Sequence, residues 1–275
     1  MKRESLNLFD LENKVTVIIG GAGILGSAIA KGLGKAGSKV AICDIADTNK
    51  IITNLKELGV RAKGYLIDVM DPKKIKECHD KLIDDYGKID ILINAAGGNI
   101  EEATVSKNLS FFDIKIFALE KVVRINLFGG AILPSQVFGK TMINNDDGGS
   151  IINISSMNAF RPLTRVIGYS AAKAAVSNFT QWLAVHFAQE YNNKLRVNAI
   201  APGFFLTSQN RFLMLDEEGN LTPRGDSIIS HTPMGEFGKP EDLIGACIWL
   251  ASDASRFVTG AVIPIDGGFG AFCGV

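Results

Sequence analysis

The chain has 275 residues, of which 47% are hydrophobic, and its 29 basic residues balance 29 acidic ones. A net charge of zero argues against nucleic acid or an anionic membrane as the main partner, so we expect a small molecule instead. This length and apolar content suit one domain over residues 1–275. The four cysteines form no C-x-x-C pair and no metal-ligand cluster, and acidic residues interrupt any signal-like start. We therefore expect reduced thiols, no metal site and a cytoplasmic location.

Short apolar runs recur along the chain, each followed by a glycine or polar turn and then by a stretch with helical periodicity. The candidate strands are Val15–Ile19, Val40–Cys43, Gly64–Ile67, Ile89–Ile93, Ser150–Ile154, Arg196–Ile200 and Val262–Ile265. Continuous β-branched runs suit strands that are buried on both faces. The pattern predicts an α/β fold, a single domain with a Rossmann-like, doubly wound parallel sheet in three αβα layers.

Residue spacing and helix-end residues predict two of the helices. Leu25, Ile29 and Leu33 form one apolar face after the first strand, and Gly37 stands where that helix should end. A second helix is expected near the C-terminus with Pro240 in its first turn.

Residues 98–118 and 204–238 are longer than ordinary connections, and each follows a strand. Ligands of doubly wound sheets bind outside the carboxyl ends of the strands, so these segments are candidate walls or lids of a substrate site. The alternative is surface elaboration without a role in binding.

A glycine-rich turn joins the first strand to the first helix. Gly21, Gly23 and Gly26 follow the order G-x-G-x-x-G, and acidic Asp44 ends the second strand. Glycines let the backbone approach a pyrophosphate at the helix N-terminus, and the carboxylate can accept hydrogen bonds from a ribose 2′-OH. The carboxylate would repel a 2′-phosphate, so the pattern favours NAD over NADP. A tight turn beside a solvated aspartate is the alternative, and the turn lacks the lysine of an ATP-binding P-loop.

Tyr169 and Lys173 are four residues apart on a predicted helix, so their side chains share one face. A neighbouring ammonium should lower the pKa of the phenol and make it a better base. Ser156, at the end of a strand, could reach the same substrate oxygen. The pattern Y-x-x-x-K by itself can occur on any amphipathic helix. Its presence together with the glycine turn is what indicates a catalytic site.

These residues resemble the classical short-chain dehydrogenase/reductase family. The shared motifs include NAAG at 94–97, VRIN ending at Asn126, NISS ending at Ser156, and RVNAIAPG ending at Gly203. The resemblance implies a catalytic tetrad of Asn126, Ser156, Tyr169 and Lys173. It also implies that Tyr169 exchanges a proton with substrate, that Ser156 stabilises the alkoxide, and that Lys173 holds the nicotinamide ribose.

The resemblance further implies a set of cofactor contacts in which Asp68 meets the adenine and Thr207 meets the carboxamide or a phosphate. The full set is Gly20, Gly21, Gly23, Ile24, Leu25, Gly26, Asp44, Asp68, Val69, Asn94, Ala95, Ala96, Gly97, Tyr169, Lys173, Pro202, Gly203 and Thr207. The turn departs from the family pattern because Ile19 replaces a threonine and Ile24 stands at the usual middle glycine.

The segments around Tyr169 and after residue 204 resemble one subgroup of the family, the D-mannonate oxidoreductases of the short-chain type, also called fructuronate reductases. This resemblance implies NAD-dependent oxidation of the C5 hydroxyl of D-mannonate, or the reverse reduction of D-fructuronate. Another sugar-acid dehydrogenase, such as one acting on gluconate or a 2-keto-3-deoxy acid, is the alternative. A protein that binds NAD without turnover is an alternative of another class.

A sugar acid needs a cation or amide for its carboxylate and hydrogen-bonding groups for its hydroxyls. The expected substrate contacts are Asn99, Ser156, Asn158, Arg161, Tyr169 and Arg211, and further candidates are Arg165, Gln209, Asn210, Arg224 and His231. Arg161 or Arg211 is the expected carboxylate anchor, against the alternative of a solvated or subunit-contact arginine. Phe204 and Phe205 are expected in a pocket wall or the core.

Family resemblance also implies a homotetramer with helices near 121–140 and 170–190 packed between subunits.

Overall fold

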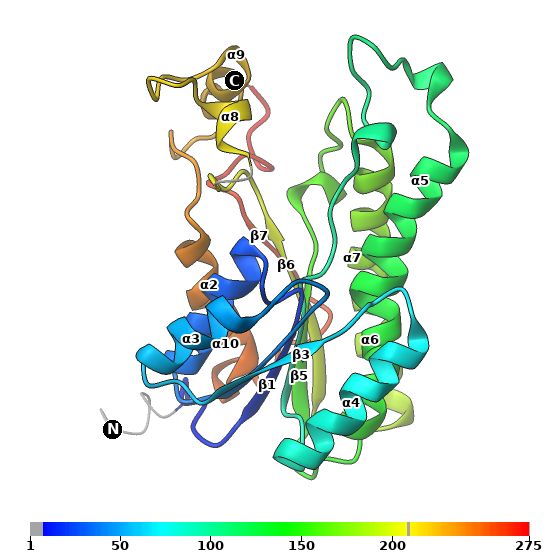
Figure 1. Cartoon of the computed structure of the whole chain (residues 1–275), viewed down its shortest axis with the longest axis vertical. Coiled ribbons are helices and arrows are strands. Elements are labelled where there is room, and N and C mark those ends of the chain that lie inside the picture. The colour runs from blue at the N-terminus through cyan, green and yellow to red at the C-terminus, as the bar shows by residue number, and fades with distance from the viewer. Residues whose placement is uncertain (1–7, 208–209, 275) are drawn as a thin grey trace.

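The computed structural model describes residues 8–207 and 210–274, and it has a seven-stranded parallel sheet in the order β3-β2-β1-β4-β5-β6-β7 (Figure 1). The strands are β1 (Val15–Ile19), β2 (Lys39–Asp44), β3 (Ala62–Leu66), β4 (Ile91–Asn94), β5 (Gly149–Ile154), β6 (Leu195–Pro202) and β7 (Val262–Ile265). The order reverses between β1 and β4, which is the switch point of a doubly wound sheet. The predicted α/β class and single Rossmann-like domain are confirmed.

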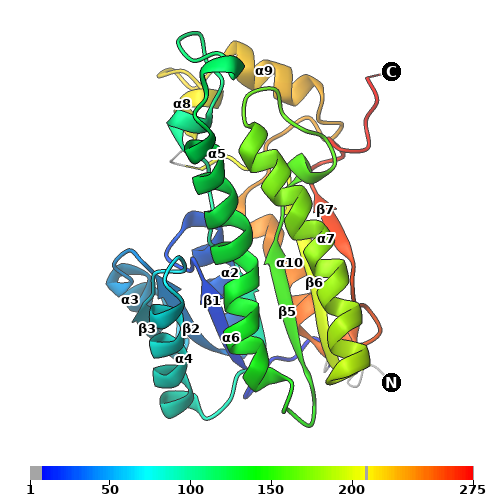
Figure 2. The same cartoon turned by 90° about the vertical axis from the view of Figure 1, so that its right-hand side faces the viewer.

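Helices cover both faces of the sheet and complete the three layers (Figures 1 and 2). One face carries α2 (Ile24–Lys35), α3 (Asn49–Glu57) and α10 (Ile244–Ala251), and the other carries α4 (Pro72–Tyr86), α6 (Leu133–Met142) and α7 (Ile167–Glu190). The first helix follows the predicted apolar face, since Ile29 and Leu33 are fully buried. It ends before Gly37, which has a φ of 104°.

The central strand shows why the protein folds in this way. Ile18 packs in the cluster on the α2 side, whereas Val17 and Ile19 pack in the cluster on the α4 side. All three side chains are fully buried, so burial on either face removes apolar area from water. The continuous apolar run therefore marks a strand covered on both sides.

The predicted strand boundaries are correct for β1 and β7 and shifted elsewhere. The third strand covers Ala62–Leu66 rather than Gly64–Ile67, because it lies at the edge of the sheet and exposes Lys63 and Leu66. Half-exposed edge strands lack the continuous apolar run that identifies central ones. The helix expected at Pro240 begins as a 3-10 turn before α10, with the Asp242 carboxylate accepting the Lys239 N–H at 2.7 Å.

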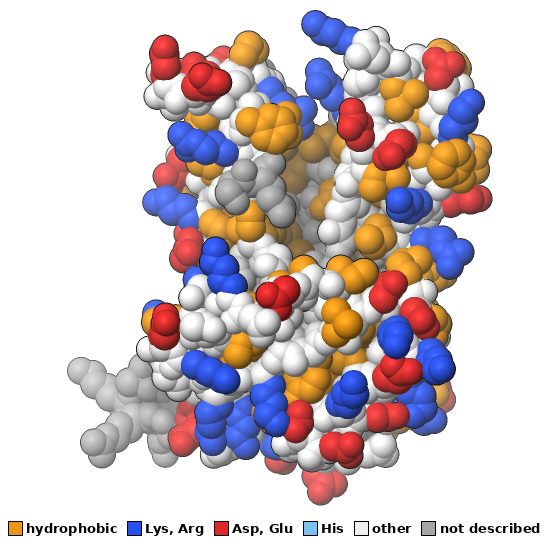
Figure 3. All heavy atoms as spheres, in the orientation of Figure 1, with side chains coloured by type: hydrophobic (Ala, Val, Ile, Leu, Met, Phe, Trp, Pro, Cys, Tyr) orange, Lys and Arg blue, Asp and Glu red, His pale blue; other side chains and the backbone are white. Residues whose placement is uncertain are grey.

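Both long segments lie beyond the carboxyl edge of the sheet. The first contains two short 3-10 turns and leads into α5 (Ile116–Val123), and the second contains α8 (Arg211–Met214) and α9 (Pro223–Ser230). The molecule is hollowed between these two raised parts, and apolar side chains line the hollow (Figure 3).

Among the described helices, none has the length and apolar character needed to cross a membrane.

Candidate active site

The glycine turn after β1 lies at the centre of the carboxyl edge. Ile19, which ends β1, is level with Cys43 of β2 and Asn94 of β4, so the following segments emerge side by side. Gly20 has a φ of 79°, and a Cβ there would lie 2.7 Å from the backbone nitrogen of Ala96. Only glycine allows the turn to pass this close to the segment after β4.

The turn also opens helix α2. Gly23 is the N-cap, and a Cβ on Gly26 would collide with the carbonyl oxygen of Gly20. No side-chain cap is present on this helix among the described residues, so its first N–H groups and the positive end of its dipole can receive an anion. Ile24, at the family's middle glycine, is half-buried and lines the adjoining cleft without filling it. The turn therefore fits a pyrophosphate.

Asp44 has a structural role that its place in the sequence does not reveal. Its carboxylate accepts the Ala22 N–H at 2.9 Å and the Ala46 N–H at 3.0 Å, and so holds the glycine turn against the end of β2. Each carboxylate oxygen has two lone pairs, so a capacity to accept ribose hydroxyls remains. The Asp44 carboxylate thus lies beside the turn, and its contact with a ribose stays a prediction.

Lys173 is buried near the middle of the site. Its Nζ donates a hydrogen bond to the carbonyl oxygen of Ile154 at 2.7 Å, which fixes the side chain across the end of β5. Burial lowers the pKa of Lys173 from 10.5 to about 8, because a desolvated ammonium is unfavourable. The group can therefore release and regain a proton near neutral pH.

Asn126 comes close to Lys173 from a different element. It lies in a π-helical segment over Arg124–Ile132, a distortion that is frequent at functional sites. A Cβ on Gly97 would lie 2.5 Å from the Asn126 Oδ1 and 3.5 Å from the Lys173 Nζ. The glycine of the NAAG motif therefore lets both side chains approach the backbone.

The buried amide of Asn126 is held by three hydrogen bonds. Its Oδ1 accepts the Gly98 N–H at 3.1 Å, and its Nδ2 donates to the carbonyl oxygens of Gly98 at 2.6 Å and Val122 at 2.8 Å. These contacts tie the π-helical segment to the start of the 98–118 segment. Asn126 is thus a rigid part of the site.

Tyr169 and Ser156 form the reactive pair. Burial raises the pKa of the Tyr169 phenol, and a hydrogen bond with the Ser156 hydroxyl opposes that rise. The expected lowering of the Tyr169 pKa is wrong for the net shift, because burial is its largest cause and raises the pKa. The Lys173 Nζ lies 5.5 Å from the Tyr169 ring centroid, and its own burial weakens it as a cation. The neutral phenol is therefore a proton donor at the start of a reduction.

A cleft of about 320 Å³ joins this pair to the glycine turn. The expected residues that line it are Gly20, Gly23, Ile24, Leu25, Gly26, Ala95, Gly97, Ser156, Tyr169, Pro202, Gly203, Phe204, Phe205, Thr207 and Asn210. A Cβ on Gly203 would lie 2.6 Å from the Cβ of Asp266, so glycine is needed where β6 leaves the sheet. The structure thus brings most of the expected cofactor contacts together with the reactive pair.

Other expected cofactor contacts lie outside this cleft. The Asn94 side chain points into the interior, where its Nδ2 donates to the Asn153 Oδ1 at 2.8 Å and the Ser135 Oγ at 3.1 Å. This amide therefore joins β4 to β5 and α6 and does not face a ligand. Gly21 and Ala96 are backbone neighbours of lining residues.

The residues expected at the adenine follow β3 along the same edge. The Asp68 carboxylate accepts the Met70 N–H at 2.8 Å, and a Cβ on Gly129 would lie 2.9 Å from a methyl group of Val69. Val69 thus packs against the π-helical segment, and neither residue lines the cleft. Their contact with adenine stays a prediction.

The expected substrate residues are scattered. Exposed Asn99 donates to the Thr104 Oγ1 at 2.6 Å, and buried Asn158 donates its N–H to the Ser156 Oγ at 3.2 Å. Arg161 is exposed and donates to the Gly270 carbonyl at 3.1 Å, whereas exposed Arg211 lies against the turn at Gly219. Neither expected anchor lines the cleft, and of the two only Arg161 has a side-chain hydrogen-bond partner among the described residues. Gln209 lies outside the described residues.

Two groups that hold the site have little or no signature in the sequence. The acceptor of the Lys173 hydrogen bond is a backbone carbonyl, at Ile154, which residue type does not reveal. Asn153, in the strand before the NISS serines, accepts from Asn94 and donates to the Thr180 Oγ1 at 2.9 Å. A polar residue inside an otherwise apolar strand was the only available clue to this buried network.

Known oxidoreductases resemble the protein over almost its whole length. The family model described as Enoyl-(Acyl carrier protein) reductase, a short-chain dehydrogenase model, matches residues 20–270. An uncharacterized oxidoreductase of Bacillus subtilis, UxuB, is 44% identical over 277 residues, covering 97% of this chain and 98% of that protein.

Two solved structures share the fold and carry bound cofactors. A Haemophilus influenzae protein, provisionally named a D-mannonate oxidoreductase and solved with NAD, has a TM-score of 0.90 at 43% identity and covers 97% of this chain and 98% of its own. A gluconate 5-dehydrogenase from Burkholderia cenocepacia, in complex with NADP and tartrate, has a TM-score of 0.84 at 29% identity, with 98% and 99% covered.

The chain belongs to the short-chain dehydrogenase/reductase family. It is an oxidoreductase of the class that acts on alcohol groups, and structures of its relatives contain either NAD or NADP.

Proposed function

We propose that the protein is an NAD-dependent oxidoreductase that interconverts D-mannonate and D-fructuronate. The observation that carries the proposal is the single cleft in which Tyr169 and Ser156 adjoin the glycine turn. The similarity to the Haemophilus structure supports the substrate, and the intact set of Asn126, Ser156, Tyr169 and Lys173 supports turnover over mere NAD binding.

Each reactive side chain has a separate role in the reaction. A nicotinamide bound in the cleft would supply or accept the hydride. In reduction the neutral Tyr169 phenol donates its proton to the carbonyl oxygen, and in oxidation the Tyr169 phenolate takes the proton of the substrate hydroxyl. Ser156 donates a hydrogen bond to the developing alkoxide. After a reduction, the Lys173 ammonium would return a proton to the Tyr169 phenolate, since its pKa of about 8 lies below that of the phenol.

The site suits NAD in particular. The Asp44 carboxylate stands beside the glycine turn, and residues 20–26 contain no arginine or lysine that could neutralise a 2′-phosphate. Lys173 and the cleft residues Gly97 and Thr207 would hold the nicotinamide half, with the pyrophosphate at the start of α2. NADP in the gluconate 5-dehydrogenase structure is a property of that relative.

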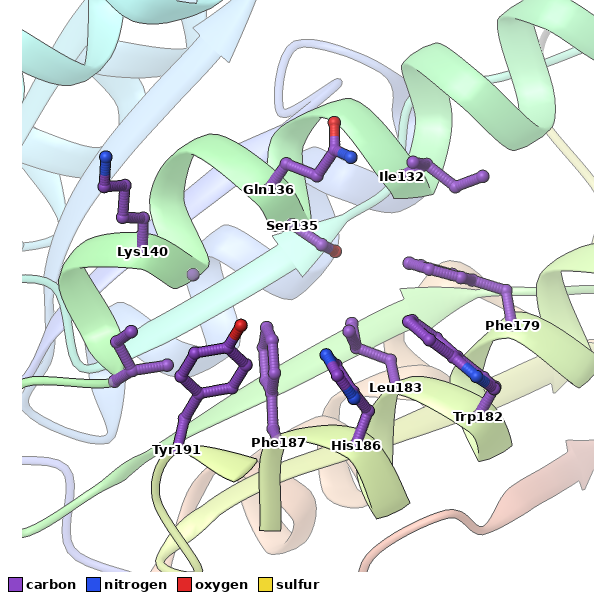
Figure 4. A pocket seen from close by; sticks show the side chains of 12 residues that line it. Ile132, Ser135, Gln136, Lys140, Phe179, Trp182, Leu183, His186, Phe187 and Tyr191 are labelled. Carbon is purple, nitrogen blue, oxygen red and sulfur yellow. The ribbon is translucent and has the colours of Figure 1, made fainter. Parts of the chain in front are cut away.

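We further propose a homotetramer with α6 and α7 at the subunit contact. A groove of about 720 Å³ between these helices is lined by Phe179, Trp182, Phe187 and Tyr191, which lie side by side along α7 and just beyond it (Figure 4). The Trp182 side chain is 56% exposed, and a second copy of the protein would remove this aromatic area from water. Trp182→Glu should therefore shift the oligomer to smaller species in size-exclusion chromatography with light scattering, whereas unchanged mass would reject this contact.

The function is tested by initial rates of NADH formation with D-mannonate, D-gluconate and D-mannitol, each with NAD and with NADP. Preference for D-mannonate with NAD is the expected result. Preference for D-gluconate would keep the mechanism and assign the alternative substrate. Tight NADH binding without turnover in either direction would favour a protein that senses the nucleotide.

A further inference from the structure

A second cavity of about 500 Å³ adjoins the cleft, and Phe204 lines both. Its walls come from residues 162–166, which lead into α7, from the start of α9, and from His231 and Phe269. The cavity thus lies between the catalytic helix and the 204–238 segment. Residues 98–118 support it as well, because the Arg165 carbonyl accepts the Val105 N–H at 2.9 Å.

Two arginine side chains line this cavity with no acidic partner among the described residues. Arg165 and Arg224 are close enough that the charge of Arg165, together with burial, lowers the pKa of Arg224. The ion pairs found in residues 8–207 and 210–274 involve neither guanidinium. Two neighbouring cations without a counter-ion repel each other, and an anion between them would relieve that repulsion.

Arg224 shows a further unmet requirement. Its Nε is buried and has no hydrogen-bond partner in the described part of the protein. An unpaired buried donor on a charged group costs free energy, and a planar guanidinium matches the two oxygens of a carboxylate. The cavity therefore lacks an acceptor of the kind that a carboxylate supplies.

His231 adds a group suited to a hydroxyl. Its Nδ1 lies 2.8 Å from the Ser227 carbonyl oxygen, an acceptor, so Nδ1 carries the hydrogen and Nε2 of the neutral ring can accept one. Thr164 lines the same cavity with a second hydroxyl-binding group. A ligand with one carboxylate and several hydroxyls matches this combination.

The second cavity lies next to the cleft that contains Tyr169. Arg165 precedes Tyr169 by four residues at the entry to α7, and Phe204 forms a wall shared with the cleft. A six-carbon acid that reacts at C5 carries its carboxylate at the far end of the molecule from the reacting carbon. In the arrangement proposed below, C5 of such a substrate lies at Tyr169 and the carboxylate enters the second cavity past Phe204.

We propose that Arg165 and Arg224 bind the carboxylate of the sugar acid and that His231 accepts one of its hydroxyl groups. The inference rests on the proposed function, in that it assumes an acidic substrate, and it replaces Arg161 and Arg211 as the expected anchor. The site selects acids that react far from their carboxylate and disfavours neutral polyols.

The test compares Arg165→Gln and Arg224→Gln with wild type, and Arg256→Gln serves as the control because Arg256 is exposed at the other end of the molecule. Each arginine variant should raise KM for D-mannonate about 10- to 100-fold, the loss expected for a charged hydrogen bond, with KM for NAD unchanged. Binding of D-mannonate to the protein–NADH complex, followed by NADH fluorescence, should weaken by the same factor. The control should match wild type in both measurements.

Parallel variants distinguish a failure of the arginine site from a failure of the proposed function. Unchanged D-mannonate kinetics in Arg165→Gln and Arg224→Gln, with a raised KM in Arg161→Gln or Arg211→Gln, would overturn the arginine site and keep the function. If wild type turns over another sugar acid instead, and Arg165→Gln and Arg224→Gln lose that activity, the arginine site is supported and D-mannonate is rejected as the substrate. A wild type that binds none of the acids would overturn both.

Discussion

The two halves of the active site are built in different ways. The cofactor half consists mainly of backbone, with Gly20, Gly26 and Gly97 placed where a Cβ would meet neighbouring atoms. The proposed acid half consists of long side chains, Arg165 and Arg224, carried on segments outside the sheet. Backbone geometry leaves little room for variation, whereas side chains on loops can change with the substrate. The first half therefore defines the family, and the second is the part that can define the substrate.

Tyr169 stands between the two halves, so its loss should have the largest effect. Tyr169→Phe removes the hydroxyl that exchanges the proton and leaves the ring in place. We expect kcat to fall about 10²- to 10⁴-fold, the usual contribution of general acid–base catalysis. NADH binding, measured by fluorescence, should be retained. Substantial residual turnover would reject the proton-transfer role.

Lys173 links the site to stability through its pKa of about 8, which is below the 10.5 of the unfolded protein. Below pH 8 both states are protonated and the buried ammonium destabilises the fold fully, by about 3 kcal/mol. Between pH 8 and pH 10.5 the folded state releases its proton first, so this penalty disappears as pH rises.

The corresponding measurement is the free energy of unfolding of wild type minus that of Lys173→Met, in the absence of cofactor. This difference should rise by about 3 kcal/mol between pH 7.5 and pH 10.5. Loss of the hydrogen bond to Ile154 shifts the difference equally at every pH and does not affect the slope. A flat difference would show that Lys173 titrates normally.

Gly26→Ala tests the backbone half alone. The new Cβ would press on the Gly20 carbonyl and displace the turn, so KM for NAD should rise at least about tenfold, corresponding to roughly 1–3 kcal/mol of overpacking. KM for the acid should change far less. Gly245→Ala is the matched control, because a Cβ on this exposed helical glycine meets nothing within 4 Å. Equal effects of the two changes would remove the steric argument.

Asp44→Asn should have the smallest effect and refines the cofactor preference. The amide oxygen can still accept the Ala22 N–H, but the negative charge is lost. We expect the ratio of kcat/KM for NADP to that for NAD to rise about tenfold, or ~1.4 kcal/mol. Asp47→Asn controls for an exposed aspartate on the same loop. An unchanged ratio would mean that the carboxylate serves only to hold the turn.

Sequence patterns predicted the features that depend on local order. The apolar run at Val15–Ile19 predicted β1 without error, and the glycine turn and the spacing of Tyr169 and Lys173 led to the cleft. The edge strand β3 was misplaced because one of its faces is exposed. The pKa of Tyr169 was predicted in the wrong direction because burial, which sequence does not measure, exceeds the influence of its neighbours.

The arginines show why the acid half was harder to predict. All the candidates are single cations in irregular or loosely periodic segments. No sequence pattern distinguishes Arg165 from Arg161, or Arg224 from Arg211, as the carboxylate anchor. Only the fold brings Arg165 to Arg224, and only the fold shows that Arg161 is held by the Gly270 carbonyl. Pairing between distant segments is a tertiary property that residue type alone does not carry.

The most direct measurement is a crystal structure of Tyr169→Phe with NAD and D-mannonate bound. We expect C5 of the acid beside residue 169 and Ser156, with the carboxylate between the guanidinium groups of Arg165 and Arg224. A carboxylate bound at Arg161 or Arg211, or an acid bound with its carboxylate at residue 169, would contradict this expectation.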